Sequence, residues 1–125
     1  MTRHVLDESK IHPAVRQKVS DNHRDFVDEA VAAVKQHDVA VLGMAINPSP
    51  AKAMRMLAAK NVPAHYIGHG SYLSGWRRRN ALKMWTGWPT FPMVFVKGTL
   101  VGGASDLEKL IASGELDTLL AAPRA

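Results

Sequence analysis

The chain has 125 residues, the length of one domain rather than two, and its 46% hydrophobic and 22% charged composition is typical of a globular protein. It contains no cysteine, which excludes disulfides, thiolate catalysis and cysteine-ligated iron–sulfur or zinc sites. The formal net charge of +5 favours acidic partners. The longest apolar run, Val39–Ile46, is too short to cross a bilayer, and no secretory signal is evident, so we expect a cytoplasmic protein that does not enter a membrane.

The first 23 residues differ from the rest of the chain. Residues 1–23 are polar and weakly patterned, so we expect an N-terminal arm or an accessory helix there, followed by a single domain over residues 24–125. Apolar residues recur at helical spacing over Arg24–His37, which predicts an amphipathic helix. The run Val39–Ile46 is rich in β-branched residues and predicts a strand that is covered on both faces.

A proline-rich tetrad separates this strand from the next helix. Asn47–Pro50 (NPSP) breaks the apolar run, and proline is tolerated in the first turn of a helix, where its missing N–H would have no partner. We therefore expect a helix over Ala51–Lys60, with Asn61 as its C-terminal stop. A short strand over Ala64–Ile67 and a helix over Tyr72–Trp85 are predicted next.

The C-terminal part of the chain predicts a hairpin and then a capped helix. Strands over Pro92–Val96 and Thr99–Val101 flank Lys97 and Gly98, and two residues are the usual length of a tight antiparallel connection.

The last helices follow the glycine pair Gly102-Gly103. Ser105 and Glu108 have the spacing of a capping box, so Ser105 is expected to cap a helix that stops near Gly114. Glu115–Leu120 adds another turn or two.

The order of these elements indicates a mixed sheet. A strand–helix–strand unit needs a crossover connection and hence parallel pairing, whereas the hairpin adds antiparallel strands. We therefore predict an α/β architecture with a mixed four-stranded sheet flanked by helices.

Several segments of the C-terminal half stand at the mutual spacing found in one known family. They are Trp88–Pro92 (WPTFP), Val94–Val96, Lys97-Gly98, Leu100–Gly103 and Ser105–Leu107. From residue 24 to about residue 120 the chain resembles the thioredoxin fold and, within it, the glutaredoxin family. The Trp-Pro before Thr-Phe-Pro is especially like the monothiol branch. The resemblance implies a thioredoxin-like fold with a proline-containing loop entering the third strand.

The resemblance also places the family's active-site motif on the proline-rich tetrad. In glutaredoxins a Cys-Pro-x-Cys or Cys-Gly-Phe-Ser motif lies between the first sheet strand and the next helix, which is the position of Asn47–Pro50. Asn47 stands in place of the nucleophilic cysteine, and Met44 in place of the lysine that supports the thiolate. Disulfide exchange needs an attacking thiolate, and the [2Fe–2S] cluster of monothiol glutaredoxins is held through that cysteine and glutathione. We therefore expect neither thiol–disulfide oxidoreductase activity nor an iron–sulfur cluster.

The family's glutathione cleft is matched by residues that the chain retains. The resemblance implies that the backbone of Phe91, before the expected cis-proline Pro92, pairs with the cysteinyl part of glutathione. Ala104 and Ser105 match the helix N-terminus that holds the γ-glutamyl carboxylate, where backbone N–H groups bind an anion without a special side chain. Arg79 matches the basic residue that meets the glycyl carboxylate. We expect glutathione, or an extended segment of a protein partner, to bind there.

Two other functions are open from the sequence. One is a glutathione-dependent transferase or isomerase in which the Ser49 hydroxyl or the Asn47 amide activates the thiol of bound glutathione, although the sequence favours helix capping as the role of both residues. The other is an interaction module in which the arm and the basic patch Arg77–Arg79 dock a partner. A single arginine cluster does not predict nucleic-acid binding, and without cysteine the six histidines do not indicate a metal site.

Overall fold

The computed structural model describes residues 3–43, 48–67 and 75–123, with the backbone alone at 48–51 and 75–79. The strands of this part of the chain are β1 (Val39–Leu42), β2 (His65–Ile67), β3 (Met93–Val96) and β4 (Thr99–Gly102). The helices are η1 (Glu8–Lys10), α1 (Pro13–Asp21), α2 (Arg24–Gln36), α3 (Pro48–Ala59), α4 (Gly75–Thr86), α5 (Ala104–Ser113) and α6 (Glu115–Ala121).

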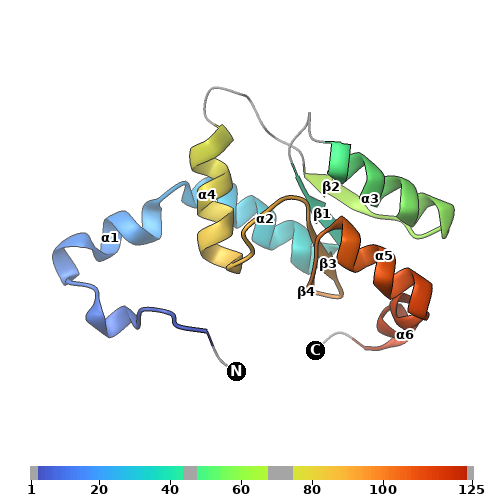
Figure 1. Cartoon of the computed structure of the whole chain (residues 1–125). Helices are drawn as coiled ribbons and strands as arrows, with labels where there is room; N and C mark the ends of the chain where they lie inside the picture. The colour runs from blue at the N-terminus through green and yellow to red at the C-terminus, as the bar shows by residue number, and fades with distance from the viewer. Residues whose placement is uncertain (1–2, 44–47, 68–74, 124–125) are drawn as a thin grey trace.

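The four strands form one mixed sheet in the order β2-β1-β3-β4. β1 pairs with β2 in parallel and with β3 in antiparallel fashion, and β3 pairs with β4 in antiparallel fashion. Helices α2 and α4 cover one face of the sheet, and α3, α5 and α6 cover the other (Figure 1). The predicted architecture, a mixed four-stranded sheet flanked by helices, is confirmed.

Alternating side chains of the two central strands build a core on each face of the sheet. Ala40 and Leu42 of β1 join the cluster under α2, whereas Val39 and Val41 join the cluster under α3 and α5. All four residues of β1 and all four of β3 are buried. This is why the sequence of these strands is apolar throughout rather than alternating.

The β3–β4 connection is the predicted two-residue hairpin. Lys97 and Gly98 have φ values of 52° and 82°, and Val96 faces Thr99 across the turn. A turn with both central φ angles positive matches the right-handed twist of the strands, and glycine meets that requirement without strain. Lys97 also ties the hairpin to the start of β1, because its N–H donates to the Asp38 carbonyl at 2.7 Å.

Helix α3 includes the prolines that were expected to precede it. It begins at Pro48 rather than Ala51, because prolines in a first turn lack only N–H groups that have no intrahelical acceptor. It ends as predicted at Asn61, whose φ of 57° is left-handed. The Val62 N–H donates to the Leu57 carbonyl at 2.9 Å and the Asn61 N–H to the Ala58 carbonyl at 3.0 Å, which is a Schellman stop.

Two element boundaries differ from the sequence prediction. β1 ends at Leu42 and not at Ile46, because Leu42 is opposite Met93, the first residue of β3, and the residue before Met93 is Pro92, which has no N–H to donate. Residues 44–46 lie outside the described residues. Helix α4 runs from Gly75 to Thr86, so the start predicted at Tyr72 also lies outside them.

The predicted capping box of α5 is wrong. The helix begins at Ala104, its N-cap is Gly103, and the Gly103 N–H donates to the Asp106 carboxylate at 3.0 Å. Ser105 therefore lies inside the first turn, and Glu108 forms an exposed ion pair with Lys52 instead. The chain turns into the helix earlier than predicted, because the left-handed φ of 112° at Gly102 redirects it directly after β4.

Residues 3–22 extend away from the sheet as an arm (Figure 1). α1 is a helix of 9 residues with none buried, in contrast to α2, which buries Phe26, Ala30, Ala33 and Val34. The division between an arm (1–23) and a domain (24–125) stays a prediction. Within the described residues no helix has the length and apolar character needed to cross a membrane.

Candidate functional site

A small hollow lies where the loop before β3 meets the start of α5. We refer to it as the cis-proline cleft; its volume is about 190 Å³. It contains Phe91, Pro92, Ala104 and Ser105, four of the residues predicted from the sequence. The residues that line it are Trp88, Thr90, Phe91, Pro92, Gly103, Ala104, Ser105 and Asp106.

The Phe91–Pro92 peptide bond is cis, as expected. Pro92 is buried and Phe91 is half-buried. The Pro92 carbonyl lies 3.5 Å from the place that a Cβ on Gly103 would take, so the loop and the helix start are in close contact. The cleft is thus formed by two segments that are distant in the sequence and held together in the fold.

The positive end of α5 forms one wall of the cleft. The first amides of an α-helix have no acceptor within the helix, and the ladder of α5 begins with the Leu107 N–H donating to the Gly103 carbonyl at 3.0 Å. The amides of Ala104 and Ser105 precede that bond and lie at the cleft. Such a helix end attracts an anion through its N–H groups and its dipole.

Asp106 gives the same wall a negative group. One carboxylate oxygen accepts from the Gly103 N–H, and a Cβ on Gly102 would lie only 2.5 Å from that oxygen. Gly102 therefore cannot be replaced without displacing Asp106. An anion-binding helix end beside a carboxylate suits a ligand that carries both charges, such as the α-amino acid group of a γ-glutamyl residue.

Trp88 contributes an unused hydrogen-bond donor. Its indole Nε1 is buried and, within the described part of the chain, is the one buried side-chain polar atom without a hydrogen-bond partner. It lies 3.9 Å from the Cβ position of Gly103. The Trp88 backbone is held in place by a hydrogen bond, because its N–H donates to the Thr86 hydroxyl at 3.1 Å.

Four lining residues, Trp88, Thr90, Gly103 and Asp106, are not among the residues predicted for the site. The sequence signal that could have found them is adjacency, since Trp88 and Thr90 precede Phe91-Pro92 and Asp106 follows Ser105. Adjacency in the sequence does not show which neighbouring residues line the cleft, because that depends on the tertiary structure.

A lysine of α4 lies over the ring of Phe91, one of the residues of the cleft. The Nζ of Lys83 is 5.8 Å from the centre of the Phe91 ring, within reach of a cation–π interaction. Arg79 lies in α4 one helical turn before Lys83, and its side chain is outside the described residues, as are those of Arg77 and Arg78.

The side chains of the two candidates for thiol activation lie outside the described residues. Asn47 lies outside the described residues, and Ser49 is in the first turn of α3 with its side chain outside them. Among the described residues no three histidine, aspartate or glutamate side chains are close enough to hold a metal ion.

Comparison with known proteins decides the family. No protein-family model matches the chain. A glutaredoxin-like protein of Dictyostelium discoideum is 40% identical over 98 residues, which are 78% of this chain and 80% of that protein. The chain belongs to the glutaredoxin family.

Further similarity connects this glutaredoxin to the monothiol branch and to solved structures. The mitochondrial monothiol glutaredoxin-S15 of Arabidopsis thaliana is 30% identical over 119 residues, which are 91% of this chain and 67% of that protein. The crystal structure of a buckwheat glutaredoxin–glutathione complex superposes with a TM-score of 0.71 at 20% identity, covering 80% of this chain and 91% of that chain. This last match shows the fold.

The chain is thus a glutaredoxin-like protein without cysteine. Neither a protein thiolate for disulfide exchange nor a protein cysteine for cluster ligation is available at any position.

Proposed function

We propose that this cysteine-less glutaredoxin binds glutathione in the cis-proline cleft and does not itself exchange thiols and disulfides. The observation that carries the proposal is the close contact between the cis Phe91–Pro92 loop and the N-terminus of α5, with Gly103 between them. An extended peptide backbone and a carboxylate are recognised by these two walls through main-chain groups alone, so recognition does not depend on the missing cysteine.

Each part of glutathione meets a group of matching chemistry. The backbone of Phe91 suits the cysteinyl peptide unit, and the first amides of α5 suit the γ-glutamyl carboxylate. Asp106 suits the ammonium group next to that carboxylate. Arg79 is assigned to the glycyl carboxylate from the family resemblance.

The first experiment is a titration of glutathione into the protein at low salt by calorimetry or NMR. We expect saturable binding that Arg79→Ala weakens. Ala104→Pro is the sharper variant, because it deletes one amide at the first helical position, where proline is well tolerated, and Gly103 before it is already extended with φ −101° and ψ −163°. Its control is Ser105→Ala, which removes a hydroxyl and keeps the amide.

The outcomes distinguish a cleft that binds glutathione from one that has lost this binding. Loss of affinity in Ala104→Pro, with affinity kept in Ser105→Ala, supports recognition by the helix amides. Absence of binding at millimolar glutathione contradicts the proposal, and the extended segment of a protein partner then becomes the candidate ligand of the cleft.

A second experiment tests the missing thiol chemistry. A disulfide-reductase assay with glutathione is expected to give no turnover above the uncatalysed rate. Asn47→Cys is expected to form a mixed disulfide with oxidised glutathione, releasing one reduced glutathione, and mass spectrometry detects the added glutathionyl group. Ala58→Cys, on an exposed position of α3, is the control for unspecific reaction.

The alternative enzyme, a glutathione-dependent transferase or isomerase using Ser49 or Asn47, is tested by glutathione consumption that depends on a second substrate. Consumption that Ser49→Ala or Asn47→Ala abolishes would favour it. The cytoplasmic location is likewise a proposal, which imaging of the full tagged chain tests.

A further inference from the structure

The large exposed apolar side chains of the described residues belong to two segments, the arm and the end of α4. Four of them belong to the arm and two to the end of α4, and we call this set the arm surface: Val5, Leu6, Val15, Val19, Met84 and Trp85. Leu6 and Met84 are 68% and 64% exposed. Single exposed apolar residues are ordinary on a protein surface, whereas a concentration of them marks an interaction site.

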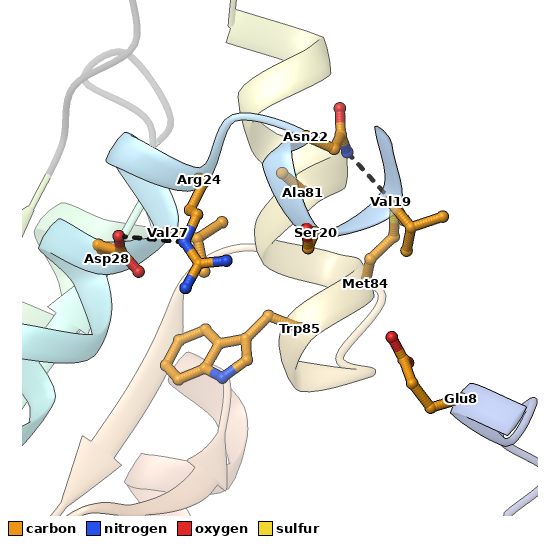
Figure 2. A pocket seen from close by; sticks show the side chains of 10 residues that line it. All are labelled: Glu8, Val19, Ser20, Asn22, Arg24, Val27, Asp28, Ala81, Met84 and Trp85. Atoms are coloured by element: carbon orange, nitrogen blue, oxygen red, sulfur yellow. Dashed lines mark hydrogen bonds and ion pairs between the residues drawn. The ribbon is translucent and has the colours of Figure 1, made fainter. Parts of the chain in front are cut away.

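Three of them, Val19, Met84 and Trp85, line a second hollow, which lies between α1, α2 and the end of α4. Its volume is about 400 Å³. Figure 2 shows Val19 and Met84 at its upper right, the Trp85 ring below, and Glu8 approaching from the arm. Val27 and Ala81 contribute further apolar walls. This hollow is separate from the cis-proline cleft and shares no lining residue with it.

The arm touches the body at two places. The Asn22 amide lies 3.8 Å from the Met84 sulfur, and the Arg3 guanidinium packs against Gly87, where a Cβ would lie 2.7 Å from it. Between these contacts the arm spans the hollow without filling it, since Val15 and Val19 stay more than two-fifths exposed.

α1 has no packing of its own to stabilise it. A helix of 9 residues is marginal in water when it stands alone, and α1 buries no residue. Val15 and Val19 are one turn apart and therefore share a face. The helix carries an apolar stripe that the described chain leaves more than two-fifths exposed, next to a hollow that the described chain leaves open.

We propose that the arm surface is a dimer interface that pairs with the arm surface of a second copy of this chain. Each copy offers both an uncovered helix and an unfilled hollow, which is the self-complementarity that a two-fold interface requires. A typical interface takes about 20–30 residues from each partner, the size of the arm together with the end of α4.

Charge favours the same pairing. Three charged residues line the hollow, the carboxylates Glu8 and Asp28 and the cation Arg24, which lies 3.7 Å from Asp28, so the charge of this lining is net negative. α1 brings Arg16 and Lys18 beside its two valines. Insertion of one copy's α1 into the hollow of the other therefore joins apolar side chains to apolar side chains and cations to carboxylates.

Sedimentation equilibrium of the full chain without glutathione tests the proposal. We expect a monomer–dimer equilibrium between low micromolar and submillimolar protein. The double variant Val15→Asp/Val19→Asp and the single variant Met84→Asp are each expected to raise the dissociation constant about tenfold or more. Ala58→Asp, the same kind of change on exposed α3, is expected to leave it unchanged.

A crosslinking experiment gives a second readout that does not depend on the stability of the variants. Because the chain has no cysteine, a single cysteine forms a disulfide only between copies. Val19→Cys is expected to crosslink under mild oxidation much faster than Ala58→Cys.

A monomer at every concentration, a dimer that neither arm variant weakens, or equal crosslinking of the two cysteine variants each overturns the proposal. The dimer measurement contains no glutathione, so its failure leaves the function proposed for the cis-proline cleft untouched, and the reverse also holds.

Discussion

The body of the molecule and its N-terminal arm both contain patterned valines, but these valines are buried in the body and exposed in the arm. In β1 the valines Val39 and Val41 lie at the centre of the sheet with helices on both faces, and both are buried. In α1 the valines Val15 and Val19 are exposed, although their spacing also gives an apolar face. Apolar patterning is therefore present in both regions, but only the body supplies a second layer for it to pack against.

The two regions therefore differ in what stabilises their conformation. The body is stabilised by side chains buried between its own sheet and helices. The arm has local hydrogen bonds, such as the Arg16 side chain donating to the Ile11 carbonyl at 2.7 Å, but no buried side chain. Its conformation therefore depends on what covers it, and the predictions below measure this contrast.

The largest effect is expected from matched Val→Ala changes in the two regions. Val41→Ala removes two buried carbon groups worth about 0.8 kcal/mol each and leaves a cavity, so we expect a loss of about 2–3 kcal/mol in the free energy of unfolding. Val15→Ala is expected to cost less than about 0.5 kcal/mol in dilute protein. Urea denaturation at low concentration compares them, and equal losses would show that the arm is packed on the body.

Gly102→Ala tests the turn that connects the body to the cis-proline cleft. The residue has φ 112°, and a Cβ there meets the Asp106 carboxylate, so we expect a loss of about 1–3 kcal/mol. Gly114→Ala is the control, because its φ of 82° is also left-handed but nothing lies within 4 Å of the added Cβ. Thermal denaturation should show a smaller loss for the control, and the reverse order would contradict the role of the Asp106 contact.

Asp106→Ala tests which residue caps α5. Loss of the hydrogen bond from the Gly103 N–H is expected to cost about 1 kcal/mol, whereas Glu108→Ala removes only an exposed ion pair and should cost less than about 0.5 kcal/mol. Chemical denaturation distinguishes them. A larger loss in Glu108→Ala would restore the capping box that the sequence suggests.

The smallest effect lies in the arm. Hydrogen bonds from the side chain and the backbone N–H of Ser9 lower the pKa of Asp7 below its usual value of 3.8. A depressed pKa makes the ionised form favour the local fold, so this contribution is present above the ordinary pKa and is lost as the pH falls through the lowered one. An NMR titration should show the pKa of Asp7 rising in Ser9→Ala, with the amide signals of the sheet unchanged through that transition. Coupled changes in the sheet would mean that arm and body fold as one unit.

Much of the fold was predictable because its signals are local. The Lys97-Gly98 turn and the Asn61 stop each follow from the backbone chemistry of one or two residues. The cis bond before Pro92 was expected from the family resemblance instead, since an X–Pro bond is usually trans. The apolar runs similarly predicted the buried strands. For the cleft, four of its lining residues followed from the family resemblance, whereas the other four, among them Trp88 and Asp106, did not.

The sequence by itself determined the family, the mixed sheet and the absence of any protein thiol, because these depend on residue identity and on spacing along the chain. Only the tertiary structure decided where β1 ends, since Pro92, which stands beyond the last paired position, comes from the loop before β3 and is distant from β1 along the chain. Tertiary structure likewise decided that Asp106, and not Ser105, caps the backbone at the start of α5. It also left the side chains of α1 without full burial. Pairing register and burial depend on which distant segments meet, and no local pattern carries that information.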